Sequence, residues 1–442
     1  MNKMQPKIIV IDDDPTGSQT VHSCLLLMKW DVDTLMQGLQ DSAPIFFILS
    51  NTRAMNPTQA IATTEEICHN LKIAIANTGI KDFLVVSRSD STLRGHYPVE
   101  TDVIAQALGG FDAHFLTPAF FEGGRVTVDQ IHYLLIDGVK TPVAKTEFAR
   151  DSVFGYSHSY LPDYVAEKTQ GKITPAQVVK FSLSDIRTGQ IQSQLLELKH
   201  NQCVVVDGEC QADFDLFAGA ILQATAQGKR FLFRSAASLL TSLAQLEPQP
   251  IAAENMASYR RTDSPGVVLV GSHVQKTTQQ LNQLLKQEQV VGIEVDVVGL
   301  RDNRPHAQKE ILELVLAAVR IAFAQDKTAV IYTSRAELSF ETVEQRLQFG
   351  EAVSALLMKV VQGLPSNLSF LISKGGITSN DVLSVGLNLT QARLLGQILP
   401  GCSVIHTAEN HPQFPNLPVV LFPGNVGNQD SLVAAWQRLT IS

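Results

Sequence analysis

The sequence predicts an α/β protein made of two three-layer domains, each with a mostly parallel sheet, joined by a linker. Short apolar runs rich in β-branched and aromatic residues alternate with helix-length amphipathic segments along most of the chain. At 246–266 prolines and turn residues interrupt this pattern. The length of 442 residues also exceeds one ordinary core. We therefore expect an N-terminal domain over 1–245, a linker over 246–266 and a C-terminal domain over 267–442.

The apolar runs of the N-terminal half predict its strands. They lie at 8–11, 45–49, 83–86, 114–117, 203–206 and 231–233. Amphipathic segments at 57–76 and 184–198 open with a proline or serine start signal, so we expect one helix in each. Between 126 and 180 the pattern is irregular and indicates an inserted segment with hairpin character.

The alternation begins again after the linker. Strands are expected at 267–270, 292–295, 329–332 and 369–373, and helices at 275–286, 306–323, 342–361 and 429–439. Successive strand and helix segments of this kind are typical of βαβ units, whose crossover connections produce parallel strands.

Composition excludes several classes of protein. A net charge of -8 and a pI near 5.8 argue against nonspecific nucleic-acid binding. The five cysteines lie far apart and form no CxxC pair, which argues against a disulfide framework or a zinc site. No signal-peptide core and no apolar run of ~18 residues is present, so we expect a soluble, cytoplasmic protein without a membrane partner.

Three consecutive aspartates follow the first predicted strand. Asp12, Asp13 and Asp14 precede a turn that contains Thr16 and Gly17. Open α/β sheets bind their ligands outside the carboxyl ends of the strands. Carboxylates at that position could hold a metal ion, accept a proton or bind hydroxyl groups, and the residue types leave all three roles open.

A second charged loop follows the strand at 83–86. It combines two arginines, an aspartate, small hydroxyl residues and a glycine: Arg88, Asp90, Ser91, Thr92, Arg94 and Gly95. Guanidinium groups suit carboxylates or phosphates, and the aspartate and hydroxyls can bind substrate hydroxyls. Arg53 and Arg125 follow two further strands. Four such loops at one sheet edge predict a polar pocket for a small, hydroxylated, anionic ligand.

Three glycine-containing loops follow strands of the C-terminal half. They lie at 271–277, 373–380 and 422–427. Strand-to-helix junctions expose unpaired backbone N–H groups, and glycine lets a phosphate approach them closely. The three loops together predict a nucleotide-phosphate site, although the chain contains neither GxxxxGK[ST] nor GxGxxG.

Taken together, these loops resemble the four-carbon acid sugar kinase family, and the likeness covers almost the whole chain. That family has an Ala-Asp-Asp-Leu-Thr-Gly-Ala motif after the first strand, which Asp13, Asp14, Thr16 and Gly17 match. Its Asp-Ser-Thr-Leu-Arg-Gly motif is reproduced without change at 90–95. Further matches are at 52–53, 118–120, 124–125 and 204–207.

The resemblance implies a kinase that uses ATP, with Mg²⁺ bound to the nucleotide, to phosphorylate a four-carbon or related sugar acid. It implies a sugar-acid domain, a nucleotide domain and an active site in the cleft between them. The residues expected to contact ATP are Ser272, Gly375, Gly376, Ile377, Thr378 and Gly424. No protein ligand of a metal is assigned. The sugar acid and ATP are the expected partners, and a homodimer is left open.

Two sets of residues are expected to act in the N-terminal domain. Asp13, Asp14 and Asp90 are equal candidates for accepting the proton of the attacking hydroxyl. The substrate-binding candidates are Thr16, Gly17, Arg53, Arg88, Ser91, Thr92, Arg94, Gly95 and Arg125. Either Arg88 or Arg94 is expected to hold the substrate carboxylate.

Departures from the family pattern leave two alternatives open. Asp12 replaces an alanine of the motif, and the resulting Asp12-x-Asp14-x-Thr16 matches the DxDxT signature of haloacid-dehalogenase-like phosphatases. In that hypothesis Asp12 is the nucleophile and Asp14 the general acid/base. The phosphatase hypothesis lacks a later lysine with a paired-acid loop and leaves the glycine loops unexplained. The second alternative is a non-catalytic nucleotide-binding protein.

Overall fold

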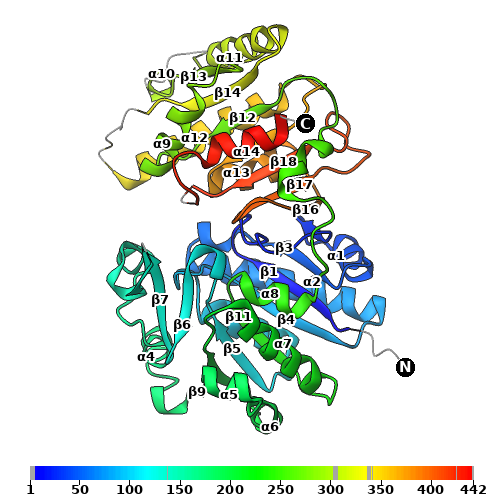
Figure 1. The fold of residues 1–442 in the computed structure, drawn as a ribbon, viewed down its shortest axis with the longest axis vertical. Helices are drawn as coiled ribbons and strands as arrows, with labels where there is room; N and C mark the ends of the chain where they lie inside the picture. The colour runs from blue at the N-terminus through cyan, green and yellow to red at the C-terminus, as the bar shows by residue number, and fades with distance from the viewer. Residues whose placement is uncertain are drawn as a thin grey trace. The chain divides into compact units, whose positions relative to one another are not determined.

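The structure, a computed structural model, describes residues 5–136, 138–301, 307–335, 340, 342–424 and 426–440. The chain divides into two compact units, Met1–Pro248 and Gln249–Ser442, which we call the N-terminal and C-terminal units (Figure 1). Strands and helices alternate in both units, as the sequence predicts for an α/β protein.

All described strand pairs within the main sheet of the N-terminal unit are parallel. In spatial order its strands are β2 (Leu25–Leu27), β3 (Ile45–Leu49), β1 (Lys7–Asp12), β4 (Phe83–Arg88), β11 (Phe231–Ser235), β5 (Ala113–Thr117), β10 (Gln202–Val206) and β9 (Val179–Phe181). After β1 the chain forms β2 and β3 on one side of it and then β4 on the other. The carboxyl ends of β1 and β4 therefore form a topological switch point, where such sheets bind ligands.

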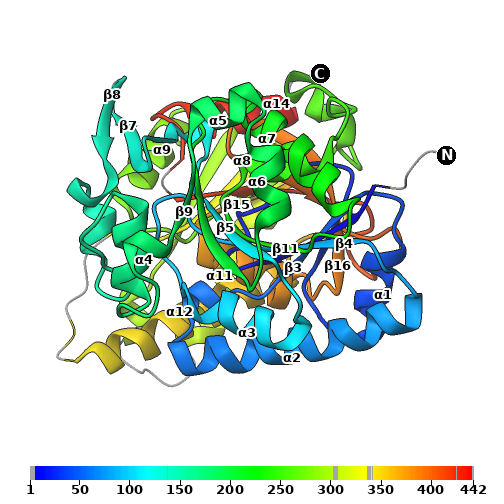
Figure 2. The same ribbon diagram turned by 90° about the horizontal axis from the view of Figure 1, so that it is seen from below.

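Helices cover both faces of this sheet (Figure 2). One face carries α1 (Val32–Gln40), α2 (Pro57–Thr78) and α3 (Val99–Leu108), and the other carries α5 (Leu183–Thr188), α6 (Ile191–Glu197), α7 (Gln211–Thr225) and α8 (Ser238–Ala244). On the first face Ile9 and Phe46 belong to one cluster with Leu71 of α2. On the second, the rings of Phe115 and Phe217 lie 5.4 Å apart. Because both faces are covered, every residue of β1 is buried.

The irregular segment after β5 contains a separate antiparallel sheet. It is formed by β6 (Arg125–Val128), β7 (Ile131–Ile136) and β8 (Val139–Pro142), which confirms the predicted hairpin character. α4 (Leu161–Lys168) follows it. Tyr164 and Val165 of α4 share a buried cluster with Leu93 and Tyr97. This insertion therefore packs against the loop that follows β4.

The sheet of the C-terminal unit is mostly parallel. In spatial order its strands are β13 (Val290–Val295), β14 (Thr328–Thr333), β12 (Val267–Val270), β15 (Leu371–Lys374), β18 (Pro418–Phe422), β17 (Cys402–His406) and β16 (Gln391–Leu399). The pairs from β13 to β18 are parallel, whereas β17 pairs antiparallel with both β18 and β16. The ends of β12, β15 and β18 therefore meet at one edge.

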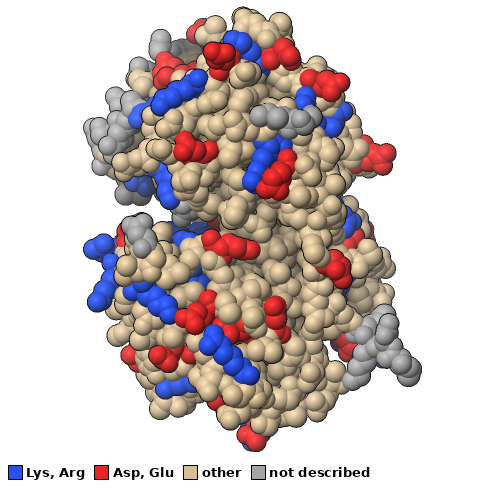
Figure 3. Space-filling view, viewed as in Figure 1, with Lys and Arg blue, Asp and Glu red and all other residues tan. Residues whose placement is uncertain are grey.

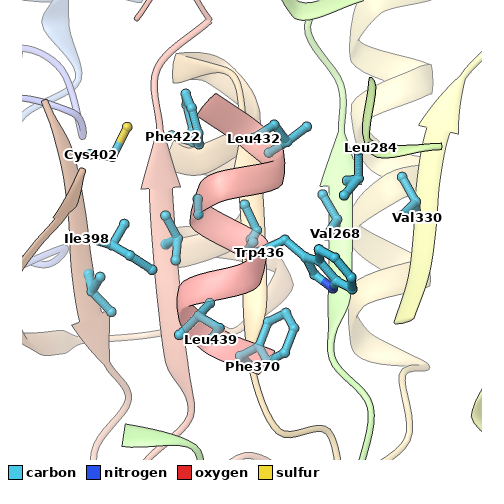
Figure 4. Packing of buried hydrophobic residues seen from close by; sticks show 14 of the residues in the cluster. Val268, Leu284, Val330, Phe370, Ile398, Cys402, Phe422, Leu432, Trp436 and Leu439 are labelled. Atoms are coloured by element: carbon cyan, nitrogen blue, oxygen red, sulfur yellow. The ribbon is translucent and has the colours of Figure 1, made fainter. Parts of the chain in front are cut away.

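The C-terminal unit has its own apolar core. Its helices are α9 (Gln275–Leu284), α10 (Val298–Arg301), α11 (Ala307–Ala324), α12 (Val343–Gln362), α13 (Gly376–Asp381), which continues as a π-helix over Val382–Gly386, and α14 (Ser431–Thr440). Figure 4 shows Trp436 and Leu439 of α14 packed beside Phe370 and Val268. The indole N–H of Trp436 donates to the hydroxyl of Thr328 at 3.0 Å.

One helix differs from the sequence prediction. The single helix expected at 184–198 is two helices, because Gly189 adopts a left-handed φ of 76° and ends α5. The segment expected as a linker, 246–266, contains a 3-10 helix at Ala253–Tyr259, and Met256 is buried in the C-terminal core. His306, where we placed the start of a helix, lies outside the described residues.

The described helices include none with the length and apolar character needed to cross a membrane. On the face seen in Figure 3, basic and acidic side chains are interspersed on each unit.

Candidate active site

Parallel strands bring charged side chains to one edge of the N-terminal sheet. Asp12 ends β1 and Arg88 ends β4. After β3 a 3-10 helix at Thr52–Ala54 carries Arg53, whose backbone N–H donates to the carbonyl of Asp13 at 3.3 Å. The loops that sequence reasoning assigned to one sheet edge therefore lie close together.

Arg53 is the central cation of this edge. Its Nη2 forms a short ion pair with Oδ1 of Asp13, and its Nη1 lies 3.1 Å from Oδ2 of Asp14 and 3.9 Å from Oδ1 of Asp90. One guanidinium thus lies within 4 Å of three carboxylates that come from two different loops. All three candidates for proton acceptance are consequently held in one cluster.

The arginines set the ionisation of these acids. Burial raises the pKa of Asp14. The positive charges of Arg53 and Arg88, together with hydrogen bonds from Thr16, lower it by more, so that the pKa lies below its usual value. Burial also raises the pKa of Asp90. The charges of Arg94 and, to a smaller extent, Arg53 outweigh this effect, so the pKa of Asp90 also lies below its usual value. Both carboxyls are therefore ionised at neutral pH.

Asp12 lies beneath the cluster and is fully buried. Its Oδ1 lies 3.3 Å from Nη1 of Arg88, and its Oδ2 has no hydrogen-bond partner in the described part of the chain. Burial raises the pKa of Asp12 to about 7, although the Arg88 charge opposes this change. Gly17 covers the carboxylate so closely that a Cβ there would lie 2.0 Å from Oδ2. A phosphoryl group has no room at Asp12, so the geometry opposes the nucleophile role of the phosphatase hypothesis.

Asp90 organises the loop after β4. Its Oδ2 accepts hydrogen bonds from the backbone N–H and the hydroxyl of Thr92 and, at 2.8 Å, from Nε of Arg94. Gly95 has φ +123°, and a Cβ there would lie 2.5 Å from the hydroxyl of Ser89. The loop therefore requires glycine at this position. The motif at 90–95 is held by contacts among its own residues and by hydrogen bonds that the hydroxyls of Tyr156 and Tyr164 donate to its carbonyls.

A hollow of about 300 Å³, part of which is open to solvent, lies beside this loop. It is lined by Ser89, Asp90, Leu93, Arg94, Tyr97, Leu116, Pro118, Tyr164, Arg234, Ser235 and Ala236. The side chain of Arg94 is 23% exposed, whereas that of Arg234 is 8% exposed. Arg94 is therefore the more accessible cation of the hollow.

Sequence reasoning missed Arg234 and Glu100. Nη1 of Arg234 donates to Glu100 at 2.6 Å and to the hydroxyl of Ser87 at 2.7 Å. Its Nη2 donates to the hydroxyl of Ser89, which in turn donates to Oδ2 of Asp13 at 2.6 Å. An arginine directly after the apolar run at 231–233 was an available signal. Glu100 lies on α3, and no sequence pattern indicated a functional role for it.

The remaining predicted residues of this unit differ in accessibility. Arg88 is buried against Asp12 and does not line the hollow, so Arg94 is the better placed of the two arginines expected to hold a carboxylate. Ser91 is buried, and its carbonyl lies 2.8 Å from Nε2 of His132. Nε of Arg125 is buried without a hydrogen-bond partner among the described residues.

Three glycine loops meet at the edge of the C-terminal sheet. They follow β12, β15 and β18, where β15 pairs with both of the others. A Cβ at Gly375 would lie 3.1 Å from Cβ of Ser272, and a Cβ at Gly424 would lie 3.1 Å from Oγ of Ser272. Ser272 therefore lies between the other two loops. We call Ser272, Gly375 and Gly424 the glycine cradle.

The cradle presents backbone donors. Gly375 has φ +126°, which favours glycine, and α13 begins at the next residue. The N–H groups of Gly376, Ile377 and Thr378 occupy the first turn, where no intrahelical partner exists. Ile377 is 72% exposed, whereas Thr378 is buried against Gly271. All residues expected to contact ATP thus lie at one sheet edge, and their donors fit an anionic phosphate group.

Within the described residues, no group of three or more histidine, cysteine, aspartate or glutamate side chains is arranged to hold a metal ion.

Two protein families match the chain, one in each half. Residues 8–243 match a family described as a sugar-binding N-terminal domain, and residues 267–432 match one described as a nucleotide-binding C-terminal domain. The fold and these matches define the class: two-domain α/β proteins that join a sugar-binding domain to a nucleotide-binding domain. Within this class, the chain belongs to the four-carbon acid sugar kinase family.

Individual relatives resemble the chain along nearly its full length. A protein of Heliobacterium modesticaldum named D-erythronate kinase is 24% identical and covers 96% of this chain and 95% of its own. A solved structure from Salmonella typhimurium LT2, provisionally named a tRNA synthase, has a TM-score of 0.71 at 19% identity over 98% of this chain and 99% of its own. A Haemophilus influenzae protein from a family of unknown function has a TM-score of 0.64 at 18% identity over 98% of this chain and 100% of its own. The two structures support the fold.

Proposed function

We propose that this protein is a kinase that transfers a phosphoryl group from ATP to a hydroxyl of a four-carbon or related sugar acid. The observation that carries this proposal is the presence, in one chain, of a charged hollow at a sheet switch point and a glycine cradle suited to phosphate. The Heliobacterium relative, named D-erythronate kinase, supports the same reaction and makes D-erythronate the first acid to test.

Phosphoryl transfer depends on positioning and charge neutralisation more than on covalent chemistry by the protein. ATP, with Mg²⁺ on its phosphates, supplies the phosphoryl group. The glycine cradle holds the nucleotide phosphates through backbone N–H groups and the Ser272 hydroxyl. A bond forms between the substrate oxygen and the γ-phosphorus as the bond from that phosphorus to the β,γ-bridging oxygen breaks. The proton of the substrate hydroxyl passes to a carboxylate of the N-terminal unit.

Asp14 is our choice for the carboxylate that accepts this proton. Its side chain is 19% exposed, compared with 12% for Asp90 and 1% for Asp13. Hydrogen bonds engage both oxygens of all three carboxylates, so exposure is what distinguishes Asp14 from Asp13 and Asp90. Asp14 combines an ionised carboxylate with the greatest access to a ligand.

We assign the substrate carboxylate to Arg94. Arg94 lines the hollow, and its guanidinium lies 4.9 Å above the ring of Phe148, which restricts its orientation. Ser89 lines the same hollow, but its hydroxyl already accepts from Arg234 and donates to Asp13. The buried Arg88 keeps its role with Asp12 in this assignment.

The test is an ADP-release assay of the full chain with Mg-ATP and a panel of four-carbon and branched sugar acids. We expect release that depends on one acid or a few closely related acids. Hydrolysis of a generic phosphomonoester without ATP would instead support the phosphatase alternative. Binding of ATP with no turnover on any acid would support the non-catalytic alternative.

A further inference from the structure

Lys374 is a fully buried lysine at the end of β15, directly before the glycine cradle. Its Nζ donates to the carbonyl of Pro423 at 2.5 Å and lies 3.4 Å from the carbonyl of Gly424. The same Nζ lies 4.0 Å from the ring centroid of Phe422. No carboxylate forms an ion pair with it in the part of the chain that the structure describes. A buried positive charge here depends on carbonyl oxygens and an aromatic face.

These contacts orient the backbone of Pro423 and Gly424, in the loop that contributes Gly424 to the glycine cradle. The carbonyl of Gly424 also accepts from the hydroxyl of Thr277 at 3.0 Å. In a planar trans peptide the C=O and N–H groups point in opposite directions. With the Pro423 carbonyl held by Lys374, the N–H of Gly424 is directed away from the lysine, and it has no hydrogen-bond partner among the described residues. That N–H is one of the donors available to a phosphate.

We propose that Lys374 is a positioning residue for nucleotide binding, which in its charged form holds the Pro423–Gly424 turn and supplies a positive charge behind the cradle. This inference rests on the proposed nucleotide-binding function. The lysine acts through the turn and does not itself contact the nucleotide. Its charge makes the cradle more favourable for a phosphate because the surroundings screen it little.

Because the charged form of Lys374 favours nucleotide binding, binding is coupled to protonation of this lysine. Burial lowers the pKa of Lys374 to about 7, and the nearby positive charge of Lys276 on α9 acts in the same direction. Cys402 on β17 faces it as well, but burial raises the pKa of that thiol to about 12, so it stays neutral. In the loop after β12, burial and the charge of Arg335 lower the pKa of His273, so this histidine is neutral above pH 7.

The sign of the pH dependence follows from these pKa values. Below pH 7 the lysine is charged before nucleotide arrives, whereas above pH 7 it is increasingly neutral. A nucleotide phosphate favours the charged form, so binding above pH 7 takes up a proton. The apparent Kd should therefore rise above pH 7, approaching tenfold per pH unit. Phosphate groups of ADP have their last pKa near 6, so at pH 8 the nucleotide takes up few protons of its own.

Calorimetric titration of the full-length protein with Mg-ADP tests this inference. At pH 8, in two buffers of different ionisation enthalpy, we expect uptake of close to one proton per nucleotide and a Kd several-fold higher than at pH 7. Lys374→Met should bind ADP at least tenfold more weakly at pH 7 and lose both the proton uptake and the pH dependence. Lys374→Gln retains a neutral donor and should lose the pH dependence while binding more tightly than Lys374→Met.

Lys359→Met is the matched control, because it removes a surface lysine charge from α12 of the same unit. It should leave ADP affinity and proton uptake unchanged. Absence of proton uptake by the unmodified protein at pH 8 would overturn the inference even if both Lys374 variants failed to fold. Unchanged ADP affinity in a folded Lys374→Met would also overturn it while leaving the kinase proposal intact. Failure of the unmodified protein to bind ADP at pH 7 would instead contradict the proposed function.

Discussion

Arg53 and the carboxylates of Asp13, Asp14 and Asp90 form an ion cluster in which each charge depends on its neighbours. The side chain of Arg53 is only 18% exposed, so water screens these charges less than it does on an open surface. Removing one partner from such a cluster leaves uncompensated charge, which costs more than the pair contributes to stability. Substitutions of single residues in this cluster therefore affect turnover, ligand affinity and folding stability to different extents.

Asp14→Asn tests the assignment of the proton acceptor. The amide keeps an oxygen that can accept from Thr16 but cannot take up the substrate proton. We expect turnover to fall about 10²- to 10⁴-fold while the Kd for ADP stays unchanged. Asp33→Asn, an exposed aspartate of α1, is the matched control and should retain full turnover. Normal turnover of Asp14→Asn would remove this residue from the chemistry.

Arg53→Met tests the cluster through the pH dependence of stability. In the folded protein the pKa values of Asp14 and Asp90 lie below their usual values. Their stabilising contribution is therefore present above the unfolded pKa of about 4 and is lost as the pH falls. We expect the variant to lose about 3 kcal/mol of unfolding free energy at pH 7 and distinctly less at pH 4, where the unpaired acids can protonate. Urea unfolding at both pH values measures this difference.

The control for Arg53→Met is Lys140→Met, which breaks the exposed ion pair between Lys140 and Glu209. It should cost less than about 1 kcal/mol, because a surface pair is screened by solvent. An equal loss for Arg53→Met at pH 7 and pH 4 would show that its effect comes from lost packing and not from charge.

Strand ends and the loops beyond them are the elements that form both candidate sites. In the N-terminal unit the loops after β1, β3 and β4 meet because their strands are adjacent and parallel. In the C-terminal unit the loops after β12, β15 and β18 meet for the same reason. Strand adjacency brings these loops together, and glycine allows their backbones to approach closely.

Gly424→Val tests the glycine cradle as an element. The residue does not need a left-handed backbone; a Cβ would lie 3.7 Å from Val274 and 3.1 Å from the Ser272 hydroxyl, which must shift slightly to accept it. The side chain would occupy the phosphate approach, and we expect the Kd for ADP to rise at least tenfold. Sugar-acid binding, measured by calorimetry, should stay the same. Gly350→Val on α12, where a Cβ meets nothing within 4 Å, is the control.

At the scale of the whole molecule, each unit has its own parallel strand pairs and its own core. Proteins with several domains often unfold in more than one step. A ligand that binds only the folded form of one unit stabilises that unit by mass action. We therefore expect each ligand to stabilise most strongly the unit whose loops bind it.

Hydrogen exchange of the full chain measures this separation. We expect Mg-ADP alone to slow amide exchange in the loops at 271–277 and 373–380, and the sugar acid alone to slow exchange in the loops at 12–18 and 87–96. Asp14→Asn should keep the protection by Mg-ADP. Protection by Mg-ADP that appears only in the N-terminal loops would contradict the assignment of the nucleotide to the C-terminal unit.

Several features were predictable from the sequence because they depend on local order along the chain. Apolar runs predicted the parallel strands, and strands such as 45–49 and 267–270 have the observed bounds. The start of α2 at Pro57 was predicted from its proline, and Asn56 caps that helix. The break at Gly189 was missed because the apolar pattern continues across it, although a left-handed glycine ends α5.

By itself, the sequence determined the α/β class, the aspartates at the end of the first strand, the motif at 90–95 and the three glycine loops, because each is a pattern of neighbouring residues. Only the tertiary structure decided which of these side chains are accessible. It placed Arg88 and Asp12 in the interior and both Arg94 and Arg234 at a hollow, and it buried Lys374 beside the glycine cradle. Burial and pairing join residues far apart in the chain, and no local pattern specifies which strand ends become neighbours or which charges lose contact with water.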